Sequence, residues 1–168
     1  MKNFILLLSI SFSFFTNAQS LPDIKIMNDK GKMVSIDSFL KIDKITVINF
    51  WANWCTPCKK EMLEIKRIRV EDDFKNIQFI SISIDQLKDV EAAKTFFKTN
   101  KLPWKLYLDT KNEFFMKVLE ITENTSTAIP ISIVIDKKGN IVSFHSGFDQ
   151  ETYKTGLLED IHMVESDN

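Results

Sequence analysis

Cys55 and Cys58 are the only cysteines of the chain, and two residues separate them. A pair at this spacing could form a static disulfide, supply half of a metal site, or open and close as a redox pair. A disulfide across two residues closes a very short loop, so it gives little entropic stabilisation. A Cys2His2 metal site would need both histidines, His145 and His162, which lie far downstream. We therefore predict a redox pair.

The two cysteines fall at the junction of a predicted strand and a predicted helix. Residues 44–50, "KITVINF", are β-branched and apolar and predict a buried strand. The stretch "PCKKEMLEIKRIRVEDDF" predicts a helix with Pro57 in its first turn. Free N–H groups at a helix N-terminus stabilise a thiolate, so Cys55 is the expected nucleophile. Cys58, one turn further on, is placed to resolve a mixed disulfide.

The predicted helix is strongly charged. In "KKEMLEIKRIRV" the charged residues alternate with Met62, Leu63, Ile65 and Ile68 at helical spacing. We interpret these charges as a solvated helix face and not as a binding patch.

Strand and helix patterns alternate along the rest of the chain. "DIKIMNDKGKMVSID" predicts a β-hairpin around a Lys30-Gly31 turn. Further strands are predicted in "IQFISISID", "WKLYLD", "ISIVID" and "IVSFHSG", and further helices in "LKDVEAAKTFFKTN", "KNEFFMKVLE" and from about Gln150 to Val164. This order predicts one α/β domain with a mixed sheet.

Residues 1–18 have the layout of a secretory signal peptide. A positively charged start precedes an apolar run over residues 4–15, and small residues follow up to Ala18, so we predict cleavage before Gln19. A retained membrane anchor is the alternative, but this run is shorter than the ~20 residues that a spanning helix needs. We expect a mature domain of residues 19–168, exported to the periplasm and not inserted in the membrane after cleavage.

The charge balance argues against some classes of partner. One of the 22 basic residues lies in the signal, so the mature chain has 21 basic against 23 acidic residues and a net charge of −2. This gives no basic surplus for binding nucleic acid and no polybasic patch for lipid.

"FWANWCTPCKKEM" resembles the thioredoxin superfamily. Together with the exported N-terminus, it is similar to the extracytoplasmic branch, the TlpA/ResA-like thiol-disulfide oxidoreductases. The resemblance covers most of residues 19–168. It implies a thioredoxin fold in which a mixed central sheet is flanked by helices, with an N-terminal β-hairpin and a strand-helix insertion at about Asp89 to Glu120.

The resemblance also implies a substrate surface around the cysteines. Family members place a cis-proline loop against the active site, and "AIP" matches it, which predicts a cis bond between Ile129 and Pro130. Backbone groups near Ile129 would pair with a substrate strand. Trp54 would form an apolar rim, and Thr56 and Pro57 would tune the redox potential through the helix start.

A buried acid that exchanges a proton with Cys58 is a further family feature. Cytoplasmic thioredoxins carry it in the strand before the motif, where this chain has Asn49, and an amide cannot accept a proton at neutral pH. The ResA-like branch supplies a carboxylate from the end of the next strand, and this chain has Asp85 there. Burial would suit Asp85 to accept the proton. The alternative role for Asp85 is an N-cap of the following helix.

The implied activity is reduction of disulfides in exported proteins, with apocytochrome c as one target and a membrane thiol carrier as electron donor. No cofactor is implied. A disulfide oxidase or isomerase with the same residues is the first alternative. A thioredoxin-fold copper carrier is the second, although such carriers usually separate their cysteines by three residues and add a dedicated histidine.

Overall fold

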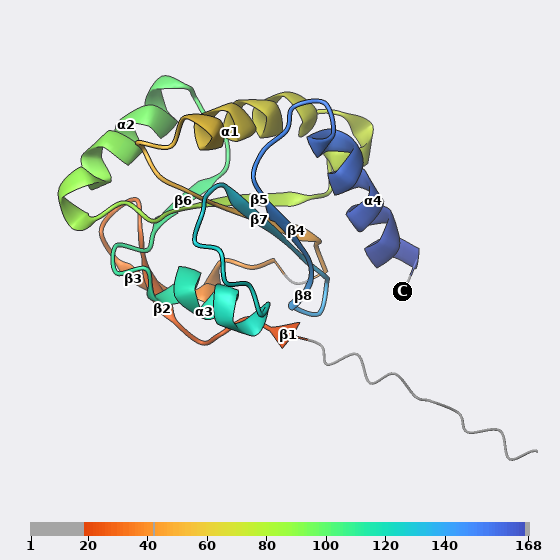
Figure 1. The fold of residues 1–168 in the computed structure, drawn as a ribbon, viewed down its shortest axis with the longest axis horizontal. Helices are drawn as coiled ribbons and strands as arrows, with labels where there is room; N and C mark the ends of the chain where they lie inside the picture. The colour runs from red at the N-terminus through yellow and green to blue at the C-terminus, as the bar shows by residue number, and fades with distance from the viewer. Residues whose placement is uncertain (1–18, 42, 167–168) are drawn as a thin grey trace, which may run out of the picture.

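An eight-stranded sheet runs through the centre of the protein (Figure 1). The computed structural model describes residues 19–41 and 43–166. The strands are β1 (Gln19–Ser20), β2 (Lys25–Asn28), β3 (Met33–Ser35), β4 (Thr46–Trp51), β5 (Gln78–Ser83), β6 (Lys105–Leu108), β7 (Ile131–Ile135) and β8 (Asn140–Ser146). The α-helices are α1 (Thr56–Ile68), α2 (Val90–Thr99), α3 (Glu113–Ile121) and α4 (Tyr153–Ser166), and short 3-10 helices are η1 (Ile36–Ser38), η2 (Asp72–Phe74) and η3 (Leu87–Asp89).

The sheet is mixed, as the sequence predicts. Its strand order is β1-β8-β7-β4-β5-β6-β2-β3. Strands β4, β5 and β6 are parallel, whereas β7 pairs antiparallel with β4 and β8 antiparallel with β7. The predicted N-terminal hairpin, β2 and β3, adds antiparallel to β6 at one edge. The predicted insertion contributes α2, β6 and α3.

Helices cover both faces of the sheet, with α1 and α2 on one side and α3 on the other (Figure 1). Successive residues of a strand point to opposite faces of the sheet, so the two faces can differ in polarity. On the α3 side, Ile48 and Phe50 of β4 belong to an apolar core, and the Phe50 ring lies 5.6 Å from the Phe114 ring and 5.3 Å from the Phe115 ring.

The α1 side of the same strands is partly polar. Val47 and Trp51 of β4 are apolar and buried, but Asn49 between them is 1% exposed. Its neighbours in register are Ser81 of β5 and Ser132 of β7, which are both buried. A polar layer therefore lies between the sheet and α1.

Two details differ from the sequence expectations. Helix α1 ends at Ile68 and not near Phe74, because residues 72–74 form η2, which buries Phe74. The short strand β1 pairs with β8, which the sequence did not predict.

The predicted signal peptide, residues 1–18, lies outside the described residues. In the part of the chain that the structure describes, no helix combines the length and apolar character needed to cross a bilayer.

Candidate active site

Cys55 and Cys58 form a disulfide at the start of α1. Cys55 is the N-cap residue of this helix, and its Sγ accepts a hydrogen bond of 3.2 Å from the Cys58 backbone N–H. Strand β4 ends at Trp51, shortly before this point. Pro57 lies in the first turn of α1, where the backbone N–H that proline lacks would have no helical hydrogen-bond partner. The predicted strand-to-helix junction is therefore confirmed, and the helix start can stabilise a thiolate at Cys55.

The Ile129-Pro130 bond is cis, as predicted. It brings the loop before β7 against the disulfide, and the Ile129 carbonyl oxygen lies 3.7 Å from Cys55 Sγ. The Pro130 carbonyl accepts a hydrogen bond of 2.8 Å from Gly147 N–H, which fixes this loop to the end of β8.

The two tryptophans near the disulfide have different environments. Trp54 is 70% exposed beside Cys55, which is the placement expected of a substrate-contacting rim. Trp51 is fully buried and packs against Phe96 and Phe97. A contact surface for a partner is thus available at Trp54 and not at Trp51.

Asp85 is buried at the end of β5, at 2% exposure. Its Oδ2 accepts hydrogen bonds of 2.8 Å from the Asn53 backbone N–H and from the Ser83 hydroxyl. The residue in the N-cap position of η3 is Gln86, so Asp85 does not cap that helix. Asp85 instead holds the loop that leads from β4 into the cysteine motif.

A second buried acid, Glu61, lies on α1 three residues after Cys58. Residues at this separation share a helix face, and both are almost inaccessible, Glu61 at 1% and Cys58 at 0%. Glu61 Oε1 accepts a hydrogen bond of 2.8 Å from the Ser132 hydroxyl. Burial raises the pKa of Glu61 from 4.5 to about 7, although the hydrogen bond from Ser132 opposes the shift.

The sequence interpretation missed Glu61. It treated the charges of this helix as a solvated face, which is wrong for Glu61 and for Glu64, since both are buried. The position of Glu61 could have indicated its burial, because Glu61 lies on the same side of the helix as Cys58 and Ile65, and this side faces the sheet. A carboxylate on a buried stripe marks an unusual site.

Residues 18–144 match the model of the AhpC/TSA family. The chain belongs to the AhpC/TSA family. Among individual relatives, it is 28% identical over 97 residues to sporulation thiol-disulfide oxidoreductase A of Bacillus subtilis, a match that covers 57% of this chain and 55% of the relative. It is 27% identical over 121 residues to thiol-disulfide oxidoreductase ResA of Bacillus thuringiensis, covering 72% and 64%.

The chain thus spans 55% and 64% of the length of these two relatives, which is less than two thirds. A solved structure of a thioredoxin-like protein from Porphyromonas gingivalis superimposes with a TM-score of 0.70 at 25% identity and covers 88% of this chain and 92% of that one. The resemblance to ResA-like proteins and the thioredoxin fold, both expected from the sequence, are confirmed.

Among residues 19–41 and 43–166, no group of three or more His, Cys, Asp or Glu side chains could hold a metal ion. The described site of this AhpC/TSA family member contains the two sulfurs of Cys55 and Cys58 and two buried carboxyl groups, Asp85 and Glu61.

Proposed function

We propose that the protein is an exported thiol-disulfide oxidoreductase that reduces disulfides in extracytoplasmic proteins of the periplasm. The observation that carries this proposal is the Cys55–Cys58 disulfide at the N-terminus of α1, facing the cis-Pro130 loop and the exposed Trp54. The names of the relatives, thiol-disulfide oxidoreductase A and ResA, support the reaction class.

The reaction follows from the positions of the two sulfurs. In the reduced protein, the Cys55 thiolate attacks a substrate disulfide, and one substrate sulfur leaves as a thiol. Cys58 then loses its proton and attacks Cys55, which releases the second substrate thiol and forms the Cys55–Cys58 disulfide. A membrane thiol carrier returns the protein to the dithiol, and apocytochrome c is one substrate of the expected kind.

The substrate would lie along the cis-proline loop. The backbone near Ile129 offers pairing groups for an extended segment, and Trp54 adds apolar contact at the rim. Thr56 and Pro57 shape the first turn of α1 and so adjust how well it stabilises the Cys55 thiolate.

Proton transfer at Cys58 needs a buried acid. We assign Glu61 to this role, because it shares the buried face of α1 with Cys58 and has a pKa near neutrality. We assign Asp85 to holding the Asn53 backbone N–H, and with it the loop before Cys55, from the end of β5.

The assignment of the nucleophile is tested by trapping. Cys58→Ala removes the resolving sulfur, so mixed disulfides through Cys55 should accumulate when the variant meets oxidised proteins. Cys55→Ala is the matched control and should trap none. If Cys55→Ala accumulates adducts instead, the assignment is wrong.

The direction of electron flow is tested by a redox titration against dithiol buffers. We expect a potential in the reducing range, near that of thioredoxin at about −270 mV and well below the oxidant DsbA at about −120 mV. A potential close to the DsbA value would instead identify an oxidase or isomerase. Insulin reduction and refolding of a scrambled substrate, measured side by side, would then separate those two.

A further inference from the structure

A row of polar side chains crosses the sheet beneath α1. Ser81, Asn49, Ser132 and His145 lie in register on β5, β4, β7 and β8, each opposite the next. Cβ atoms of directly opposed residues are about 5 Å apart, so each side chain can reach its neighbours. The row starts in the interior at Ser81 and ends at His145, whose side chain is 34% exposed.

Glu61 lies above the middle of this row. Its Oε1 accepts the hydrogen bond from Ser132, whereas its Oε2 is buried without a hydrogen-bond partner. The hydroxyl of Tyr153, at the start of α4, lies near Glu61 and Ser132 and is also buried without one. Buried polar atoms without a hydrogen-bond partner are rare in proteins. These two atoms therefore indicate a position where a proton could be exchanged.

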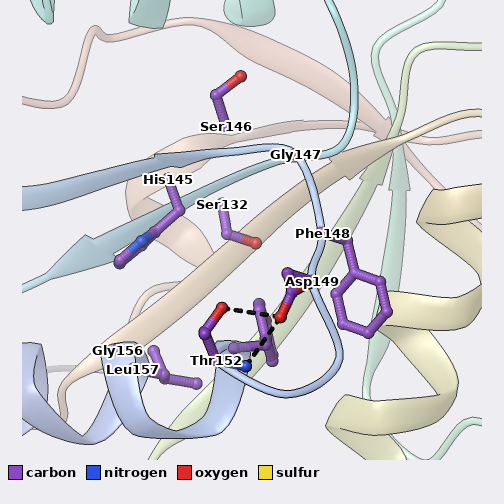
Figure 2. Close-up of a pocket in the computed structure, with 10 residues that line it drawn as sticks. Ser132, His145, Ser146, Gly147, Phe148, Asp149, Thr152, Gly156 and Leu157 are labelled. Atoms are coloured by element: carbon purple, nitrogen blue, oxygen red, sulfur yellow. Dashed lines mark hydrogen bonds between the residues drawn. The ribbon is translucent and has the colours of Figure 1, made fainter.

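A pocket of about 390 Å³ reaches this position from the surface (Figure 2). It lies between the end of β8 and α4, and Ser132, His145 and Tyr153 are among its lining residues. Neither cysteine, nor Trp54 or Pro130, lines it. Ser132 therefore borders the pocket and also donates a hydrogen bond to Glu61.

We propose that Ser132 and His145, with the pocket between β8 and α4, carry protons between the buried Glu61 carboxyl and solvent. This path would allow the proton of Cys58 to enter and leave away from the surface that the substrate covers. The inference rests on the proposed oxidoreductase function and on the role of Glu61 in it.

The proton balance can be followed in the direction of disulfide reduction. A donor thiolate attacks Cys55, the S–S bond breaks, and its electron pair goes to Cys58, which takes a proton from Glu61. The Ser132 hydroxyl then gives its proton to Glu61 and receives one, through water in the pocket, from the protonated His145, so Glu61 is restored. His145 regains its proton from solvent. A second donor thiolate attacks the mixed disulfide, which leaves the donor oxidised and both cysteines reduced.

His145 is suited to the outer end of this path. Its Nε2 is paired with Asp160 of α4 and lies 3.2 Å from the Ser143 hydroxyl. The hydrogen bond with Asp160 raises the pKa of His145 above 6.5, although its partial burial opposes this. A histidine with a raised pKa can hold a proton at the mouth of the pocket and pass it inward.

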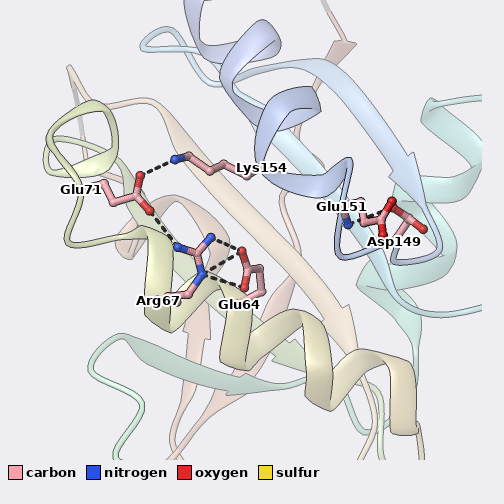
Figure 3. Close-up of polar contacts among 6 residues, drawn as sticks. All are labelled: Glu64, Arg67, Glu71, Asp149, Glu151 and Lys154. Carbon is pink, nitrogen blue, oxygen red and sulfur yellow. Dashed lines mark hydrogen bonds and ion pairs between the residues drawn. The ribbon is translucent and has the colours of Figure 1, made fainter.

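Four charged residues near the path are linked by ion pairs. Glu64 of α1 pairs with Arg67, Arg67 also pairs with Glu71, and Glu71 pairs with Lys154 of α4 (Figure 3). This chain of ion pairs fixes α4 against α1. It therefore fixes Tyr153, next to Lys154, over Glu61.

The test is the rate of turnover with dithiothreitol as donor and oxidised insulin as acceptor, measured at several buffer concentrations. The double variant Ser132→Ala/His145→Gln should turn over about tenfold more slowly than the wild type at low buffer concentration. Added imidazole, which fits the pocket and carries protons, should restore most of the rate. The wild type should respond little to imidazole.

Two results would overturn the proposal. One is a double variant whose rate and buffer dependence equal those of the wild type. The other is a slow double variant that imidazole does not accelerate, since that would mean only a structural defect. If the double variant does not fold, His145→Gln alone is measured in the same way, because this partly exposed residue tolerates substitution more readily.

Controls separate this proposal from the proposed function. Ser146→Ala changes a serine next to His145 whose hydroxyl points away from His145 and Ser132 (Figure 2), and should behave like the wild type. Glu61→Gln should be slow and insensitive to imidazole; turnover at the wild-type rate would refute the path. Cys55→Ser should be inactive, and activity in that variant would refute the proposed function itself.

Discussion

At the scale of single residues, the two sulfurs differ in their surroundings. Cys55 receives the N–H of Cys58 at the helix start and lies near the Ile129 carbonyl. Cys58 is fully buried on the face of α1 that also carries Glu61. The helix start at Cys55 favours a thiolate, whereas the buried, apolar surroundings of Cys58 favour a neutral thiol that passes its proton to a neighbour.

Glu61 should leave a signature in the pH dependence of stability. Its pKa is about 7 in the folded protein, against 4.5 for an ordinary glutamate, so the folded state holds the proton more tightly. The stabilisation from the protonated form is complete below pH 4.5 and is lost as the pH rises through about 7. Relative to Glu61→Gln, the wild type should lose on the order of 3 kcal/mol of unfolding free energy across this window.

The measurement is urea unfolding of both proteins at a series of pH values. Comparison with Glu61→Gln removes the effects of other shifted carboxyl groups, such as Asp109 and Asp136, because both proteins contain them. Parallel curves for the two proteins would show that Glu61 titrates normally.

At the scale of elements, β4 separates two different environments. Its residues Ile48 and Phe50 face the aromatic side chains of α3, and Asn49 faces the polar layer beneath α1. The apolar side supplies packing energy, whereas the polar side places groups that can exchange protons. Strand β4 thus contributes to stability on its α3 side and to the chemistry of the site on its α1 side.

Helix α3 gives a direct test of the packing role. Phe114 is fully buried against Phe50, so Phe114→Ala should cost about 3–5 kcal/mol of unfolding free energy. Met116 on the same helix is 52% exposed, and Met116→Ala should change stability by only about 0.5 kcal/mol. Urea unfolding of the two variants is the check, and equal losses would contradict the assigned faces.

At the scale of the whole molecule, the sequence predicted the order of most elements and the position of the redox pair. Both follow from local signals: hydrophobic periodicity in β4 and β5, Pro57 at the start of α1, and the "AIP" segment at Pro130. The cysteine motif was specific enough to indicate the family as well.

The polar interior could not be predicted in this way. The row from Ser81 to His145 depends on strand order and register, which no single segment of sequence contains. Glu61 looked like one more charge on an amphipathic helix until Ser132, 71 positions away, was seen to contact it. The sequence left Asp85 as a proton acceptor or, alternatively, a helix cap, because its long-range partner, the N–H of Asn53, cannot be inferred from neighbouring residues.

The contact between Asp85 and Asn53 has a spectroscopic consequence. The Asn53 N–H belongs to the loop that carries Trp54 and Cys55, yet it donates to a carboxylate that is itself out of reach of solvent. In a nuclear magnetic resonance spectrum, the chemical shift of this one amide proton would report whether its hydrogen bond to Asp85 persists in the oxidised and the reduced protein. Slow exchange of the same proton with deuterium would report that the loop stays attached while the sulfurs react.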